Sequence, residues 1–379
     1  MISQLFSLRL MGAKVHISLQ KKECFQPAFR TEPQLNQSDS GCLADKTYSH
    51  IIMSTISQRI GWIDWMKSIG IYFIVLGHFF SVGDKYIYVF NVPLFFVISG
   101  FLSKEETDDK VFWRKLWYNL IVPMIIISTI NYLYACAQLS LSGTFELKFI
   151  AYFIFHILFG FHAGFGNCWF VYTLVLLKIV HQYCRNCKLL YWGIVPALIT
   201  AYLYNHFDLS HISGYLVAPN SIVNFCTAFP FFIAGIFLKT KKDDISSLNS
   251  KALLCFVFLT GASMVYICGH FNDYVWMYHC GYGNHLFLFL TGGIAGTCSI
   301  FTLSKMLKHT PAFILSLSKG TILILGFHGY FISLFRENFH RSIADFCFAA
   351  FIVGVFVPII LITEKHFPLI MGKYRTSND

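Results

Sequence analysis

Long apolar segments recur along the chain from about residue 60 to residue 363, with only short polar stretches between them. A helix needs roughly 20 apolar residues to cross a bilayer core of about 30 Å. This repetition predicts an all-α, polytopic integral membrane helix bundle. The apolar segments lie near residues 62–82, 86–103, 116–139, 146–161, 168–184, 189–205, 221–238, 251–269, 282–303, 318–335 and 343–363.

The positive charges indicate which segments cross, because cytoplasmic loops collect Lys and Arg. The loops that this rule places inside carry Lys104, Lys110, Arg114 and Lys115, then Arg185 and Lys188, then Lys239, Lys241 and Lys242, then Lys305, Lys308 and Lys319. The loop with Arg336 and Arg341 is then external and is the main exception, and Lys85 and Lys148 are lone external cations. The alternation of loops holds if 146–161 does not cross, and that segment is short and begins with charged residues. We therefore predict about ten transmembrane helices plus one short re-entrant or interfacial segment, with both termini in the cytoplasm.

The composition agrees with a membrane protein and excludes other classes. Hydrophobic residues make up 56% of the chain and charged residues 13%, against roughly 25% charged in a soluble domain. The connecting loops are too short to cover so much apolar surface. The net charge of +10 is spread over short clusters between apolar segments, which suits anionic membrane lipid and not nucleic acid. No metal site is predicted, because His156 and His162 do not have zinc spacing on a helix.

The polar and apolar pattern also divides the chain. Residues 1–52 are polar and aperiodic, and they predict a disordered N-terminal extension, with Met53 as an alternative start. Residues 53–365 form the predicted membrane domain. Residues 366–379 form a predicted cytoplasmic tail.

The first apolar segment carries ionisable residues at both ends. Lys67 and His78 are separated by about three helical turns, or roughly 16 Å, and fall on nearly the same face. Asp64 precedes Lys67 by one turn and can pair with it. Ionisable groups at membrane depth are costly and mark functional sites by default.

Each of these residues has a functional and a structural interpretation. His78 suits a general base that takes a proton from a hydroxyl, or a histidine that bonds between helices. Lys67 can hold an anionic group or extend to the lipid headgroups. Arg114 and Lys115, at the start of the third segment, suit a phosphate-bearing donor or are ordinary positive-inside charge.

Three further residues are candidates near such a site or its acceptor. Ser99 stands among aromatic residues in Phe95–Phe101, where small residues also serve close helix packing. Trp169 opens the segment at 168–184. His328 is a second histidine inside an apolar segment, with the same two interpretations as His78.

Together these residues resemble the membrane acyltransferase-3 family. The family carries Arg or Lys, ten residues and then His on its first helix, and Lys67 and His78 match that motif. Four more stretches follow in the family's order: Val92–Phe101, Cys168–Val171, Phe229–Gly235 and Leu325–His328. The chain is most similar to the fucose 4-O-acetylase-like subgroup. It departs from the family at Asn119, ahead of Pro123, where a second Arg is usual.

The resemblance implies an O-acetyltransferase in a bacterial-type inner membrane. Such an enzyme moves an acyl group from cytoplasmic acetyl-CoA to a hydroxyl of an extracytoplasmic carbohydrate, either a surface glycan or a lipid-linked saccharide. It implies catalytic roles for His78 and Asp64 and donor binding by Lys67, Arg114 and Lys115. Acetyl-CoA is then a substrate, and no permanently bound cofactor is expected.

Two other functions remain open at this point. A transporter or flippase of a polysaccharide precursor also carries buried His and Lys. Inverted repeats and broken helices in matching positions would favour it, and the sequence shows neither. A non-catalytic scaffold predicts that Lys67, His78, Arg114 and His328 do not gather in space. The positions of these residues in the fold separate the alternatives.

Overall fold

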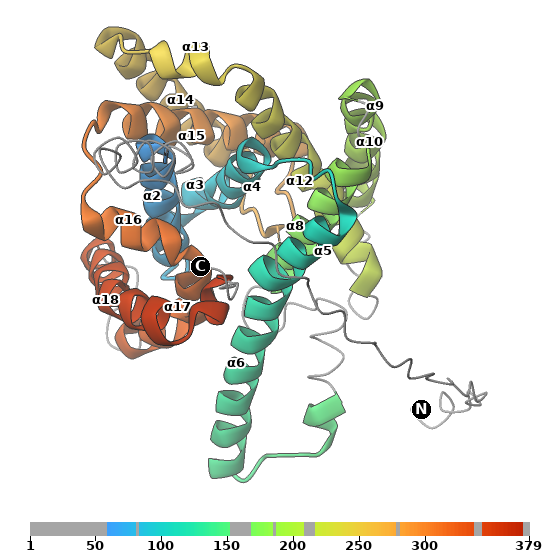
Figure 1. Ribbon diagram of the computed structural model, residues 1–379, viewed down its shortest axis with the longest axis vertical. Helices are drawn as coiled ribbons and strands as arrows, with labels where there is room; N and C mark the ends of the chain where they lie inside the picture. The colour runs from blue at the N-terminus through green and yellow to red at the C-terminus, as the bar shows by residue number, and fades with distance from the viewer. Residues whose placement is uncertain are drawn as a thin grey trace, which may run out of the picture. The chain divides into compact units, whose positions relative to one another are not determined.

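The chain folds into a helical bundle (Figure 1). The computed structural model describes residues 59–80, 83–151, 168–184, 187–207, 217–277, 281–336 and 343–373. Within these ranges there is no β-strand, only an isolated antiparallel bridge between Trp276 and Gly281. The all-α polytopic class is therefore confirmed. The predicted extension at 1–52 and most of the segment at 146–161 lie outside the described residues.

The long helices correspond to apolar segments of the sequence, and short helices such as those at Asp109–Leu116 and Lys242–Ser247 lie between them. In chain order they are α2 (Gly61–Gly77), α3 (Asp84–Tyr88), α4 (Asn91–Leu102), α5 (Asp109–Leu116), the π-helical turn η1 (Trp117–Ile121), α6 (Val122–Leu141), α8 (Cys168–Tyr183), α9 (Cys187–Trp192), α10 (Ile194–His206), α12 (Val217–Thr240), α13 (Lys242–Ser247), α14 (Lys251–Phe271), α15 (Leu286–Met306), α16 (Ala312–Lys319), α17 (Thr321–Arg336), α18 (Ala344–His366) and the 3-10 turn η3 (Pro368–Met371).

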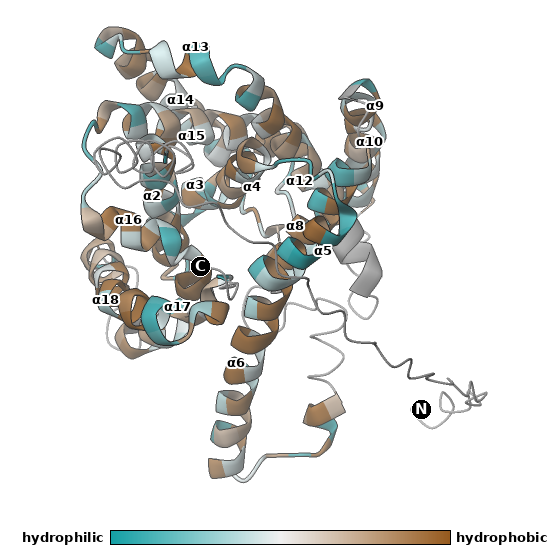
Figure 2. Cartoon of the chain, viewed as in Figure 1, coloured by the Kyte–Doolittle hydropathy of each residue, from teal (hydrophilic) through white to brown (hydrophobic). Residues whose placement is uncertain are grey.

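Several of these helices are long and apolar enough to cross a membrane. The described ranges contain six such helical segments, or seven when α16 and α17 count as one broken span. Figure 2 shows hydrophobic residues along most of the long helices, with hydrophilic residues gathered on α5 and α13. The predicted count of about ten crossings stays a prediction, because α2, α8 and α10 are shorter than a full span.

Helix α2 is surrounded by other helices. It packs against α3, α4, α15, α16, α17 and α18. Its residues Ile71, Val75 and Leu76 are almost fully buried. A helix enclosed in this way holds its two polar ends inside the bundle, where water is scarce and polar interactions are strong.

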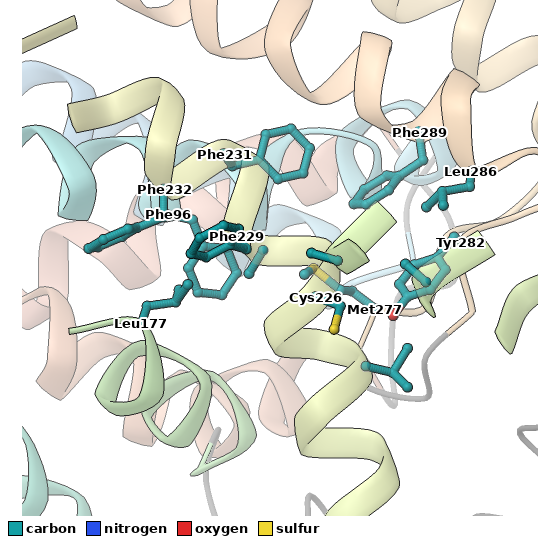
Figure 3. Close-up of a cluster of buried hydrophobic side chains, with 14 of the residues drawn as sticks. Phe96, Leu177, Cys226, Phe229, Phe231, Phe232, Met277, Tyr282, Leu286 and Phe289 are labelled. Carbon is teal, nitrogen blue, oxygen red and sulfur yellow. The ribbon is translucent and has the colours of Figure 1, made fainter. Parts of the chain in front are cut away.

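A second core fixes α8 and α12 against α4. Phe96 of α4, Leu177 of α8 and Phe232 of α12 are fully buried together, and Phe231 of α12 contacts Phe289 of α15 (Figure 3). Large aromatic side chains of this kind bury much area and define the geometry of a core. The basic residues that α8 and α12 carry are therefore held on a rigid frame.

The apolar segment at 318–335 forms α17, apart from its first residues, which end α16. The two helices meet at an angle of 86°. Gly320 lies at the bend, and its backbone packs so closely on Ile360 of α18 that a side chain there would collide. The bend thus depends on a contact with a distant helix, which local periodicity does not reveal.

Glycines allow α4 and α12 to touch through their backbones. A Cβ added to Gly235 would collide with the backbone of Val97 and Phe101, and one added to Gly100 with the backbone of Phe232. We expect Gly235→Ala to destabilise the protein by about 1–3 kcal/mol, the usual cost of overpacking. Thermal unfolding in detergent would measure this. The matched control is Gly354→Ala on α18, where an added Cβ meets nothing within 4 Å; equal stability of both variants would contradict the prediction.

The predicted topology can be tested at two loops. Reporter fusions after Arg185, which follows α8, and after Lys242, which follows α12, should both give a cytoplasmic signal because these loops are basic. A fusion after Asn272, which follows α14, should report the opposite side. An external signal at Arg185 would reject the ten-helix arrangement.

Candidate active site

Two histidines from distant parts of the sequence meet inside the bundle. His78 ends α2 and His328 lies in α17, and their ring centroids are 4.7 Å apart with planes at 77°. The His328 side chain is only 3% exposed, and His78 is half-buried. The structure thus brings together the two histidines that the sequence singled out separately.

The hydrogen bonds of both rings identify their basic nitrogen. His78 Nδ1 lies 2.7 Å from the Ile74 carbonyl oxygen, and His328 Nδ1 lies 2.9 Å from that of Ile324. A carbonyl oxygen only accepts, so each Nδ1 carries the proton, and Nε2 of the neutral ring is the acceptor. His328 Nε2 is buried, with no hydrogen-bond partner in the described part of the chain. Such a nitrogen is suited to receive a proton from a hydroxyl.

A hydrogen-bonded asparagine fixes the helix that carries His328. Asn131 of α6 donates from Nδ2 to the Gly326 carbonyl oxygen at 3.1 Å and accepts from the Tyr330 hydroxyl at 2.7 Å. Both partners belong to α17 and lie on either side of His328 in sequence. Asn131 was not singled out from the sequence, although a polar amide inside an apolar segment is the signal that marks such a bond.

Asp64 lies at the opposite end of α2 from His78. The distance along the helix axis is about 21 Å at 1.5 Å per residue, so Asp64 is not part of the histidine pair. Its buried carboxylate accepts a hydrogen bond of 2.5 Å from the Ser318 hydroxyl of α16. Any role of Asp64 therefore concerns the end of α2 that carries Lys67, and its expected support of Lys67 stays a prediction.

Lysines from three helices approach one another at this end. Lys178 of α8 donates from Nζ to the Ser103 hydroxyl at 3.3 Å, and Lys239 of α12 donates to the Ser103 carbonyl oxygen. Lys67 of α2 and Lys239 both lie within electrostatic range of Lys178. We refer to Lys67, Lys178 and Lys239 as the lysine cluster.

Further charged residues lie near the lysine cluster. Lys104 and Glu105 both act on Lys239, and Glu105 also lies 3.9 Å from Nε2 of His181. Even with Asp64 counted at the same end, lysines outnumber these carboxylates. An excess of partly buried positive charge attracts anions, and above all phosphate groups.

Lys178 and Lys239 were not identified as site residues from the sequence. Lys178 stands alone inside the apolar segment 168–184, and a single charge at such a position is itself a signal of function. Lys239 begins a basic loop and is counted there as ordinary positive-inside charge. Only the packing of α8 and α12 on α4 shows that Lys178 lies within electrostatic range of both Lys67 and Lys239.

Arg114 and Lys115 lie on the exposed surface of α5. Lys115 forms an ion pair of 2.7 Å with Glu106, whose backbone exchanges two hydrogen bonds with the side chain of Gln182. Gln182 follows Lys178 by one turn of α8, so this pair lies close to the lysine cluster, but its charge is largely neutralised. Donor binding by Arg114 and Lys115 stays a prediction.

The chain departs from a regular helix where the family's second arginine is usual. Asn119 lies in the π-helical turn η1, ahead of Pro123. Proline has no N–H to donate to the carbonyl of Asn119, so the regular hydrogen-bond ladder is interrupted there. Gly372, with φ of 68°, packs its backbone on that carbonyl oxygen.

Ser99 and Trp169 lie where α4 and α8 pack together. The Ser99 carbonyl oxygen accepts from the Ser103 hydroxyl at 2.8 Å. The Trp169 ring lies 6.1 Å from Phe170, whose ring contacts Phe96 at 4.9 Å. These contacts explain both residues by helix packing, and their predicted link to an acceptor stays a prediction.

The fold and this geometry define an integral membrane protein with a histidine pair and a lysine cluster at the two ends of one enclosed helix. Residues 60–364 match the family described as acyltransferase domain, Acyl_transf_3. This match covers most of the chain, so the protein belongs to the acyltransferase-3 family and is a membrane acyltransferase. No curated protein and no solved structure matches it. Family membership favours the enzyme over the transporter and the scaffold.

Proposed function

We propose that the protein is an O-acetyltransferase that modifies cell-surface carbohydrate. It takes an acetyl group from cytoplasmic acetyl-CoA and places it on a hydroxyl of an extracytoplasmic glycan or lipid-linked saccharide. The protein resides in a bacterial-type inner membrane with both termini in the cytoplasm. The observation that carries this proposal is the histidine pair, in which the hydrogen bonds leave Nε2 of each neutral ring as the basic nitrogen.

The chemistry is a direct acyl transfer. His78 Nε2 accepts the proton of the acceptor hydroxyl, and the oxygen attacks the carbonyl carbon of the thioester. The carbon–sulfur bond then breaks, and the CoA thiolate leaves and takes up the proton that His78 holds. The acceptor becomes an acetyl ester and the donor becomes free CoA. His328, in ring contact with His78, holds a second basic nitrogen beside it.

The lysine cluster is the proposed site of the CoA phosphates. Each phosphate can accept charge-assisted hydrogen bonds from the ammonium groups, and these are strong where water is partly excluded. The distance from Lys67 to His78 is roughly 16 Å along α2. The flexible pantetheine arm of CoA is the part of the donor that would extend from the phosphates towards the histidines.

The proposal is tested with the full chain in lipid nanodiscs and with whole cells. Purified protein should release free CoA from acetyl-CoA when a carbohydrate acceptor is present. Mass spectrometry of surface polysaccharide should show the added mass of one acetyl group per ester, and only in cells that carry the gene. Identical polysaccharides with and without the gene, together with no CoA release, would reject the proposal.

A further inference from the structure

Four aromatic side chains form a continuous set of ring contacts beside His78. The Tyr88 ring lies 6.5 Å from the His78 ring and 5.5 Å from Trp276. Trp276 also contacts Phe80 at 5.7 Å and Tyr274 at 6.0 Å. We call Phe80, Tyr88, Tyr274 and Trp276 the aromatic shelf.

The shelf is held in place by hydrogen bonds. The Tyr88 hydroxyl donates to the Gly77 carbonyl oxygen at 3.1 Å, next to His78. The backbone of Trp276 exchanges two hydrogen bonds with Gly281, at 2.8 and 3.1 Å. The Tyr274 hydroxyl donates to Oδ1 of Asp84 at 2.6 Å, and Asp84 is only 4% exposed. Rings fixed in this way offer a binding surface without a large loss of side-chain entropy.

The rings are also partly accessible and are inclined to one another at moderate angles. All four side chains are half-buried, unlike the core aromatic Phe96, which has no exposed surface. The planes of Phe80, Tyr88 and Tyr274 make angles of 36°, 30° and 24° with that of Trp276. Partly exposed aromatic rings are suited to a flat, partly apolar ligand.

A pyranose ring has that shape and chemistry. One of its faces presents mainly C–H groups, which pack on an aromatic ring, while its hydroxyls project from the edge. With the sugar face on Trp276, an edge hydroxyl would be directed along Tyr88 towards His78. The shelf therefore supplies what the histidine pair lacks, which is a surface that orients an acceptor hydroxyl.

We propose that the aromatic shelf is the subsite that binds a pyranose ring of the acceptor, with Trp276 as its main platform. The inference rests on the proposed function, because it assigns the acceptor side of the same reaction. Phe80 and Tyr88 extend the platform, and Tyr274 acts as a positioning residue that Asp84 holds. The alternative occupant is the lipid headgroup region, where Trp and Tyr often gather.

Saturation-transfer NMR on the full chain in nanodiscs tests the subsite directly. The probes are the methyl pyranosides of glucose, galactose, mannose and 6-deoxygalactose, with glycerol as a polyol that has no ring face. At least one pyranoside should receive saturation, strongest at the C–H protons of one face, and glycerol should receive none. Trp276→Leu, which keeps an apolar side chain but removes the ring, should abolish the signal, and Trp276→Phe should keep most of it.

The matched control is Trp192→Leu, because Trp192 is 72% exposed and lies on α9, away from the shelf. This variant should retain the wild-type signal. A signal that survives in Trp276→Leu, or no transfer to any pyranoside, would overturn the subsite and favour a lipid-facing role. A normal melting temperature of Trp276→Leu shows that loss of signal is not loss of folding.

Kinetics separate this inference from the proposed function. In Trp276→Leu the apparent KM for the carbohydrate acceptor should rise about tenfold, which corresponds to about 1.4 kcal/mol, while the KM for acetyl-CoA should not change. If the wild-type protein binds a pyranoside through Trp276 but never consumes acetyl-CoA, the subsite stands and the transferase proposal fails. If acetyl transfer occurs with equal acceptor KM in wild type and variant, the transferase stands and the subsite fails.

Discussion

Replacing His78 by alanine is expected to lower acetyl transfer by about 10²–10⁴-fold, the usual cost of losing a general base. The ring is held by Ile74 at Nδ1 and contacts His328 at 4.7 Å. The sequence of α2 contains no other histidine that could replace it. Expression and membrane insertion should persist, because His78 is the C-terminal cap of α2 and the buried residues that pack this helix precede it in sequence. The rate is measured as CoA release with saturating acetyl-CoA and acceptor.

A matched variant and a double mutant sharpen this test. His270→Ala removes an exposed histidine from the end of α14 and should leave turnover unchanged. If the two site histidines act as a unit, His78→Ala combined with His328→Ala should cost little more than the larger single effect. Near-normal turnover in His78→Ala would remove this residue from the mechanism, and fully additive losses would show that the two rings act independently.

Replacing Lys67 or Lys178 by methionine is expected to raise the apparent KM for acetyl-CoA by about 10–100-fold. A hydrogen bond to a charged group contributes about 1.5–3 kcal/mol, and both ammonium groups belong to the lysine cluster. Methionine keeps the length and apolar stem of lysine, so packing is largely preserved. Initial rates over a range of acetyl-CoA, at fixed acceptor, measure the effect.

The size of the effect should follow the depth of the cation. Arg114→Ala should raise the KM less, because Arg114 is exposed on α5 and its charge is screened by water. Lys251→Met, at the exposed start of α14, serves as the control and should have no effect. An acetyl-CoA dependence that is unchanged in both Lys67→Met and Lys178→Met would mean that the donor binds elsewhere.

The helices and one half of the candidate site follow from local sequence. The apolar segments predict the bundle because each must hide its backbone and side chains from water within a bilayer. Helical periodicity alone places Lys67 and His78 on the same face of α2, at opposite ends. These features depend on residues that are close in the chain, so a pattern of types and spacings is enough to predict them.

The other half of the site depends on contacts between residues far apart in the chain. The pairing of His78 with His328 requires α17 to pack on α2, and Asn131 of α6 fixes α17 in that position. The approach of Lys178 to Lys67 and Lys239 requires α8 and α12 to pack on α4, and Gly100 and Gly235 allow α4 and α12 to touch. Which faces meet is decided by the fit of many side chains at once, and hydrophobic periodicity does not encode that fit. The sequence by itself therefore predicted a membrane bundle with a polar first helix, and the tertiary structure decided which residues complete its two ends.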